Sequence, residues 1–132
     1  KRRRMKLILA IAFGGAVGSV GRYYIAGLAE RWFATFLGAG FPYGTVVVNV
    51  LGSFVLGALV ESFAVILMPS GEVRALIFIG VFGSFTTFSA FSSGSYLLLE
   101  RGEIGRALLY ILVSLAISVG AFFVGLRLLR LP

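Results

Sequence analysis

The sequence has no cysteine and no histidine, and charged residues make up only 13% of its 132 residues. Without cysteine there is no disulfide framework, no thiolate nucleophile and no thiolate metal site. Without histidine the chain lacks the commonest general base and metal ligand. These absences exclude many catalytic classes, and we predict that the protein is not an enzyme.

Apolar residues dominate what is present. The chain is 59% hydrophobic, with a mean hydropathy of +1.03, which lies outside the range of soluble domains. A bilayer-spanning helix needs about 20 mostly apolar residues. We therefore predict an all-α, multi-pass membrane protein, with one domain over residues 1–132. Its four predicted spans are 7–28, 45–68, 74–99 and 107–126, joined by a loop at 29–42 and turns at 69–72 and 100–106.

The charged residues are predicted to lie at the ends of the spans. A net charge of +7 can indicate nucleic-acid binding, but in so apolar a chain it favours contact with membrane lipid. No carboxylate falls at mid-membrane, where proton-coupled transporters and cation pumps ordinarily need a titrating group. The five acids that lie near span ends or in loops are Glu30, Glu61, Glu72, Glu100 and Glu103.

The most informative stretch is residues 80–95, which holds three glycines and seven hydroxyl residues inside the third span. Small residues and hydroxyls can form a tight helix–helix seam. They can also permit a helix break, because Ser and Thr side chains satisfy freed backbone groups in hydrocarbon. With Phe85, Phe88 and Phe91 spaced three apart, the whole run favours a break beside a polar, aromatic-lined site.

Polar residues in the first two spans each have two interpretations. Arg22 either snorkels to the interface or lies at the mouth of an anion path. Asn49 lies one helical turn after Thr45 on the same face. Its amide either bonds to a neighbouring helix or donates to an anion. Gly14, Gly18 and Gly21 form a small-residue face that predicts close helix packing.

The fourth span also carries a polar face, with Ser114 and Ser118 one turn apart and Tyr110 one turn before them. All the residues predicted at depth are hydroxyl or amide donors, together with aromatic rings whose edges are positive. A path lined in this way suits a small anion better than a cation. The set comprises Thr45, Asn49, Ser53, the cluster at 83–95, Ser114 and Ser118.

The segment Gly83-Ser-Phe-Thr-Thr-Phe-Ser-Ala-Phe-Ser92 resembles the signature of the small bacterial fluoride channels, the Fluc or CrcB-type proteins. The Thr-Thr-Phe-Ser-x-Phe-Ser core is specific when it lies in the third of four spans. Further matches follow the same order along nearly the whole chain. They are Gly21-Arg22, Gly44-Thr45, Val48-Asn49, Arg101-Gly102 and Gly105.

The resemblance implies a passive channel in the bacterial inner membrane, which gives fluoride resistance by exporting fluoride that enters as hydrogen fluoride and ionises inside. It implies an antiparallel, dual-topology dimer with two fluoride pathways between the subunits. The pathway residues implied by the resemblance are Asn49, Phe88, Phe91, Ser114 and Ser118, to which we add Thr45, Arg22 and Tyr110. A central structural sodium ion would be held by the backbone carbonyls of Gly83 and Thr86.

The chain departs from this pattern in two places. Family members commonly have Gly-Gly-Leu before the two threonines, whereas this chain has Gly83-Ser84-Phe85. Serine is small enough to keep the break. Relatives also often carry a glutamate where this chain has Gly94, so a role for that acid at the pore mouth does not transfer.

Two other functions compete with a channel. A small multidrug-type proton antiporter also has four spans, but it should carry an embedded glutamate in its first span, and residues 7–28 contain none. A non-transporting subunit of a membrane assembly predicts no ion flux at all.

The orientation in the membrane depends on where translation starts. The face with both termini carries eight basic residues, and the other face carries Arg31, Arg101 and Arg106, or four residues with Arg22. Such an imbalance would fix one orientation and require an oppositely inserted paralogue as partner. With a start at Met5 the first face keeps four, and this balance permits an antiparallel homodimer, which we favour. The eight are Lys1, Arg2, Arg3, Arg4, Lys6, Arg74, Arg127 and Arg130.

Overall fold

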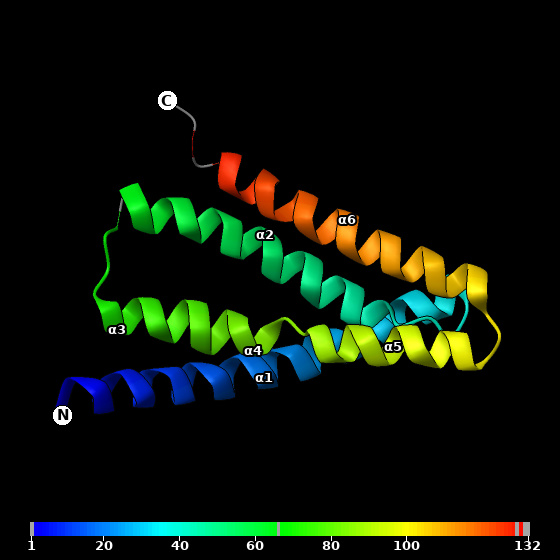
Figure 1. Cartoon of the computed structure of the whole chain (residues 1–132), viewed down its shortest axis with the longest axis horizontal. Helices are drawn as coiled ribbons and strands as arrows, with labels where there is room; N and C mark the ends of the chain where they lie inside the picture. Colours follow the sequence, from blue (N-terminus) through cyan, green and yellow to red (C-terminus); the bar gives the residue numbers. More distant parts are fainter. Residues whose placement is uncertain (1, 66, 129, 131–132) are drawn as a thin grey trace.

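The computed structural model describes residues 2–65, 67–128 and 130, in which all regular secondary structure is helical (Figure 1). Four helical segments are long and apolar enough to cross a membrane. The predicted all-α, four-span architecture is confirmed, and the chain is a multi-pass membrane protein. The elements are α1 (Arg2–Leu37), α2 (Tyr43–Val65), α3 (Gly71–Arg74), η1 (Ala75–Phe82), α4 (Gly83–Phe85), α5 (Phe88–Glu100) and α6 (Ile104–Leu128).

The connections are shorter than the sequence predicts. The loop predicted at 29–42 is wrong over most of its length, because α1 continues to Leu37. Residues 29–37 contain no glycine or proline, and the helix ends at Gly38, whose φ is 88°. The turn predicted at 69–72 is also too long, since α3 begins at Gly71 with Ser70 as its N-cap. As the even number of spans predicts, α1 begins and α6 ends at the same end of the molecule (Figure 1).

Glycines bring three pairs of helices into backbone contact: α1 with η1, α2 with α6, and α1 with α2, where a Cβ at Gly44 would meet the Ala26 carbonyl. A side chain at Gly14 or Gly18 of α1 would collide with the backbone of η1, at Leu76 and Val81 respectively. A side chain at Gly57 of α2 would likewise meet the Phe122 carbonyl of α6. The small-residue packing predicted for α1 is therefore confirmed at Gly14 and Gly18. Gly21 is less tightly enclosed, since a Cβ there would lie 3.7 Å from the Phe85 ring.

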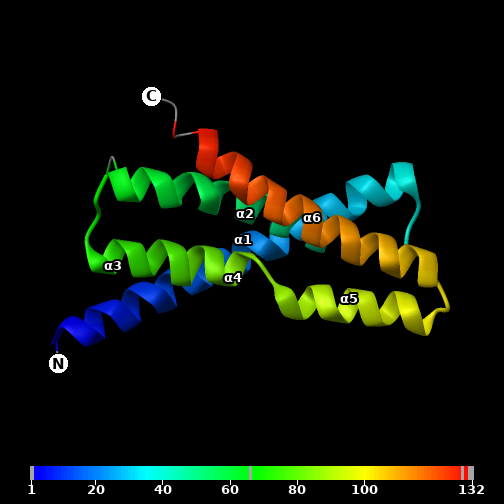
Figure 2. The same ribbon diagram turned by 45° about the horizontal axis from the view of Figure 1, so that its top comes forward.

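The third span is irregular in two ways, of which the break between α4 and α5 is visible in Figures 1 and 2. Its first half contains η1, an eight-residue π-helix that nothing in the sequence analysis predicted. Between α4 and α5 the chain then leaves the helical conformation for two residues. Thr86 (φ −79°, ψ 158°) and Thr87 (φ −153°, ψ 117°) are both extended. The helix break predicted in this span is thus present.

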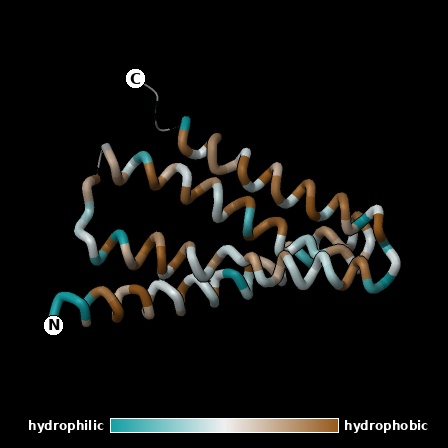
Figure 3. The backbone as a smooth tube through the Cα atoms, viewed as in Figure 1, coloured by the Kyte–Doolittle hydropathy of each residue, from teal (hydrophilic) through white to brown (hydrophobic). Residues whose placement is uncertain are grey.

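Many large apolar side chains of the described residues are exposed. Figure 3 shows hydrophobic residues along the lengths of the helices and hydrophilic ones gathered toward the helix ends. α5 packs on α6 and touches α2, but it does not pack against α1, as Figure 2 shows. Where α5 packs on α6, a small core comprises Leu98, Ala107 and Tyr110, with Phe41, Val46 and Phe91 around it.

Candidate functional site

Threonine side chains satisfy the backbone at the break. The Thr86 hydroxyl donates to the Phe82 carbonyl at 2.8 Å. The Thr87 hydroxyl accepts from the Ala90 N–H at 3.1 Å and so caps the N-terminus of α5. Hydroxyl residues therefore do at the break what the sequence analysis expected of them.

Asn49 of α2 holds the break from the side. Its Oδ1 accepts the Thr87 N–H at 2.8 Å, and its Nδ2 donates to the Thr87 carbonyl at 3.1 Å. Of the two interpretations of Asn49, the interhelical hydrogen bond is therefore observed. An amide nitrogen carries two N–H donors, so one remains for another acceptor.

These bonds change the partners of two backbone carbonyls. In an unbroken α-helix the Thr87 N–H would bond to the Gly83 carbonyl, and the Ala90 N–H to the Thr86 carbonyl. Here the first N–H goes to Asn49 and the second to the Thr87 hydroxyl. Gly83 and Thr86, which the resemblance nominates as sodium ligands, thus both lose their helical donors. Carbonyl oxygens are suitable ligands for a hard cation.

A cavity of about 260 Å³ opens beside the break, between α2, α5 and α6. It brings together five of the eight predicted pathway residues, namely Asn49, Phe88, Phe91, Ser114 and Ser118. Thr86 and Thr87 also line it, and so does Ser53, which the sequence analysis placed at depth without assigning it to the pathway. Thr87 was missed as a central residue, although its place before Phe88 matches an N-cap pattern.

The two serines of α6 present hydroxyls to this cavity. Ser114 is only 5% exposed, and neither its Oγ nor that of Ser118 has a hydrogen-bond partner among the described residues. A buried hydroxyl without a partner costs about 1–3 kcal/mol. Both oxygens are therefore poised to bond to something outside the described part of the chain.

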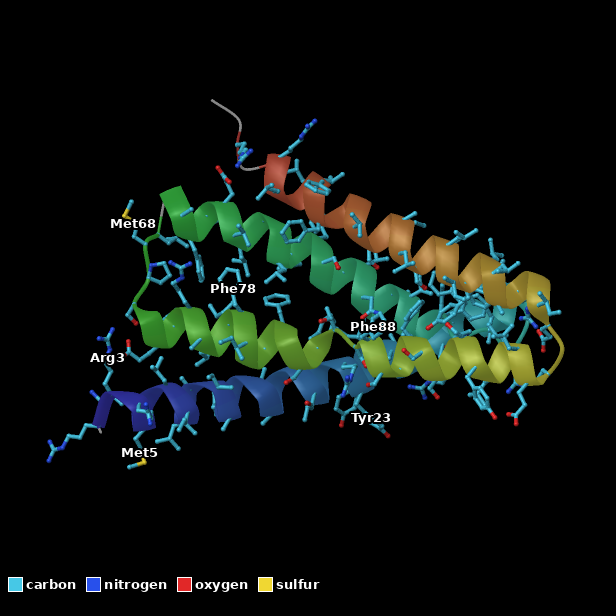
Figure 4. The ribbon with its side chains drawn as sticks, viewed as in Figure 1. Arg3, Met5, Tyr23, Met68, Phe78 and Phe88 are labelled. Atoms are coloured by element: carbon cyan, nitrogen blue, oxygen red, sulfur yellow. The ribbon has the colours of Figure 1, made fainter. Side chains whose placement is uncertain are left out.

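The two phenylalanines differ in their surroundings. Phe88 is 75% exposed and lies beside the break at the start of α5 (Figure 4). Phe91 is half-buried, with its ring centroid 5.3 Å from that of Phe88 and 5.5 Å from that of Tyr110. The Phe91 ring is consequently fixed from within the chain, while the Phe88 ring is left for a partner or lipid.

Three predicted residues lie outside this cavity. Arg22 and Thr45 line an adjoining one of about 400 Å³, and Thr87 lines both. Tyr110 is fully buried behind Phe91 and lines neither. Its ring also packs near Gly94, where a Cβ would lie 2.9 Å from Pro42 and 3.1 Å from the Tyr110 oxygen. Pro42 and Tyr110 therefore occupy the space that a side chain at position 94 would need.

Four of the five acids have hydrogen-bond partners, and Glu30 also lines the adjoining cavity together with Thr87. Glu30 accepts the Gly44 N–H at 2.9 Å near the start of α2. Glu61 accepts from Arg130 at 3.1 Å near the end of the same helix. Within the described residues, no group of three or more His, Cys, Asp or Glu could hold a metal ion. A cation at the break would therefore rely on backbone carbonyls.

Comparison with known proteins agrees with this site. The family model described as "CrcB-like protein, Camphor Resistance (CrcB)" matches residues 9–126. Three similar relatives are each named "Fluoride-specific ion channel FluC". The one from Geobacter metallireducens is 51% identical over 49 residues, which is 37% of this chain and 36% of the relative. The one from Opitutus terrae is 53% identical over 49 residues, 37% of this chain and 34% of the relative.

The third relative, from Shewanella amazonensis, is 53% identical over 49 residues, 37% of this chain and 36% of the relative. The matched stretches thus span about a third of the length of these relatives. The family match extends much further, over all four helical spans. The resemblance seen in the sequence is confirmed, and the chain belongs to the CrcB-like family.

Proposed function

We propose that this chain is a passive fluoride channel, and that fluoride passes through the cavity beside the helix break. The observation that carries the proposal is the lining of that cavity at membrane depth. It offers an amide N–H, two aromatic rings and two buried hydroxyls that have no partner among the described residues. No carboxylate lines it. The relatives named as fluoride-specific channels support the same conclusion.

The lining replaces water around a small anion. Ser114, Ser118 and the remaining Asn49 N–H donate hydrogen bonds, and a hydrogen bond to a charged group contributes about 1.5–3 kcal/mol. Phe88 and Phe91 present ring edges, which are electropositive. No carboxylate lines the cavity beside the break, so passage there needs no coupled proton, and fluoride moves down its own gradient.

The remaining predicted residues extend the pathway. Arg22 and Thr45 line the adjoining cavity, which shares Thr87 with the first. An arginine at such a position attracts anions toward the break. Tyr110 acts from behind, because it fixes the ring of Phe91.

We further propose that two copies assemble antiparallel, with two separate pathways between them. The support is the incomplete enclosure of the site in one copy, where Phe88 is 75% exposed and α5 does not pack against α1. A four-span chain is also too small to enclose a pore by itself. If one orientation dominates, an oppositely inserted paralogue would replace the second copy.

The carbonyls of Gly83 and Thr86 would hold a structural sodium ion in this assembly. These carbonyls suit a cation because the N–H groups that would bond to them in a helix bond elsewhere. The Thr87 N–H donates to Asn49, and the Ala90 N–H donates to the Thr87 hydroxyl. A bound cation would stabilise the folded dimer by mass action. Replacing sodium by N-methylglucamine should therefore lower the melting temperature of the dimer. An unchanged melting temperature would count against the ion.

The channel would act in the bacterial inner membrane, where it would export fluoride that accumulates as hydrogen fluoride crosses the bilayer and ionises. Efflux from liposomes tests the activity. Fluoride-loaded vesicles should release fluoride only when valinomycin lets potassium follow, since passive anion flux carries charge. Chloride-loaded vesicles should release far less. Equal release of both anions would disprove fluoride selectivity, and absence of flux would favour a non-transporting subunit. Proton-driven uptake of a cationic amphiphile would favour the antiporter.

A further inference from the structure

We infer that an apolar groove remote from the break binds one anionic phospholipid, with an acyl chain along the groove and its phosphate on Arg106 and Arg101. The groove has a volume of about 430 Å³ and lies between the end of α1, the start of α2 and the start of α6. Nothing in the proposed ion pathway uses it. Its lining comprises Phe33, Leu37, Phe41, Tyr43, Val46, Val47, Arg106, Leu109 and Val113.

The groove is oriented to receive a lipid tail. Arg106 is near the start of α6, and Val113 lies roughly 10 Å further along the same helix. The positive charge is therefore at the outer end of the groove, and only apolar side chains line it toward the bilayer interior. An anionic phospholipid is arranged in the same way, with its charged headgroup at the interface and its hydrocarbon chains toward the bilayer interior.

Aromatic residues place the outer end at the membrane interface. The Trp32 and Phe33 rings lie 5.1 Å apart, and Phe33 stacks on Tyr43 at 5.7 Å. Trp and Tyr gather at the depth of the lipid headgroups. A lipid lying in the groove would thus have its phosphate at the same depth as the phosphates of the surrounding bilayer.

Arg106 lines the groove, and Arg101, which lines a neighbouring cavity that shares Phe41 with the groove, approaches it at Gly40. A Cβ at Gly40 would lie 3.2 Å from Arg101 Nη1 and 3.9 Å from Arg106 Nη1. Arg101 donates to the Gly40 carbonyl at 3.2 Å, and Arg106 donates to the Ala39 carbonyl at 3.3 Å. Both guanidinium groups are therefore held beside one loop before any lipid arrives.

The arginines keep donors for a phosphate. Arg106 also pairs with Glu103 at 2.5 Å, and its guanidinium carbon lies 5.8 Å from the centre of the Phe41 ring. Each guanidinium has five N–H donors, which suit phosphate recognition. Among the described residues, only one N–H of Arg101 and two of Arg106 are engaged. Basic pockets between transmembrane helices commonly recognise anionic headgroups.

The groove faces away from the proposed pathway. Ser114 and Ser118 face the cavity at the break, whereas Leu109 and Val113 face the groove. At about 100° per residue, members of the two pairs lie roughly 100–180° apart around α6. A lipid can therefore occupy the groove without entering the ion path.

Native mass spectrometry of the purified full chain tests the site, with dioleoylphosphatidylglycerol and dioleoylphosphatidylcholine as the two probes. We expect the anionic lipid to bind more tightly. Arg106→Gln and Arg101→Gln should each weaken its binding about fivefold and leave the zwitterionic lipid unaffected. Leu109→Trp should fill the groove and weaken binding of both lipids. Arg31→Gln is the matched control, because Arg31 lies at the same end but donates to the Gly27 carbonyl within α1 and not to the loop that holds Arg101 and Arg106.

Equal binding of the two lipids by the unaltered chain would overturn the inference. Unchanged binding of phosphatidylglycerol in both Arg101→Gln and Leu109→Trp would also overturn it. These two variants remain informative if Arg106→Gln, which loses its pair with Glu103, fails to fold. The chain has no cysteine, so Leu109→Cys introduces a single thiol. Disulfide formation between two copies at that position would show that a second copy covers the groove, and would also overturn the inference.

Discussion

The two parts of the third span are held in different ways. η1 lies so close to α1 that Gly14 and Gly18 meet its backbone directly. α5, beyond the break, does not pack against α1 and rests on α6 through the rings of Phe91 and Tyr110. The first part is packed backbone to backbone against α1. The second leaves space lined by hydroxyls, and the break separates the two environments.

The largest effect is expected where the first part is most closely packed. In Gly18→Ala the added Cβ collides with the Val81 carbonyl, so the backbones of α1 and η1 must separate. Overpacking of this kind costs about 1–3 kcal/mol or more. Thermal unfolding followed by Trp32 fluorescence should show a clear drop in melting temperature. Gly27→Ala is the control, because no atom lies within 4 Å of its added Cβ. Equal melting of the two variants would show that the contact is not essential.

The next effect concerns the boundary between the two parts. Asn49→Ala removes both hydrogen bonds to Thr87, so the Thr87 N–H and carbonyl lose these partners. Each buried group left without a partner costs about 1–3 kcal/mol of stability. Fluoride efflux should fall to background, with a lower melting temperature. Asn49→Asp should not restore efflux, because its second oxygen faces the Thr87 carbonyl instead of donating to it. Ser62→Ala is the control, since that hydroxyl bonds only within its own helix. Normal efflux in Asn49→Ala would refute the role of this pair.

Changes in the second part should affect flux more than stability. Phe88→Ile and Phe91→Ile remove the ring edges and should each reduce efflux by about tenfold or more, while the proposed dimer stays intact by light scattering. Phe91→Ile should also cost about 1 kcal/mol of stability, because its ring packs on Tyr110. Phe36→Ile, at a ring that is 69% exposed on α1, is the control. If both variants conduct normally, the two rings do not line the path.

The smallest expected effect is at a single hydroxyl. Ser114→Ala removes a buried oxygen that has no partner among the described residues, so stability should stay equal or rise by up to about 1 kcal/mol. Fluoride efflux should nevertheless fall severalfold, because a donor is lost. The exposed Ser19→Ala on α1 is the control. A stability loss without an efflux change would make Ser114 structural.

Patterns of local composition predicted much of this molecule. Apolar length predicts the four spans, and the density of hydroxyls around Thr86 and Thr87 predicts the break, because only side-chain donors and acceptors permit one in hydrocarbon. The same reasoning fails for the loop at 29–42, since α1 continues as a helix until Gly38. The π-helix over 75–82 was likewise not predicted from the sequence.

The site was predictable as a set of residues but not as an arrangement. Helical spacing places Ser114 and Ser118 on one face, yet it cannot show that Arg22 and Thr45 line a separate cavity from them. Nor does spacing decide between the two interpretations of Asn49. That choice depends on a pairing across 38 residues of sequence, which only the packing of α2 against the break establishes.

The pairing of Asn49 with Thr87 also bears on how the protein is made. While the third span is alone in the bilayer, the Thr87 N–H has no partner from α2, and hydrocarbon requires that it find one. The Gly83 carbonyl one turn earlier is the nearest acceptor, so we expect the isolated third span to continue as a helix through the break. A peptide of residues 71–100 in lipid should then be more helical than the same residues in the folded protein, where Asn49 of α2 bonds to Thr87.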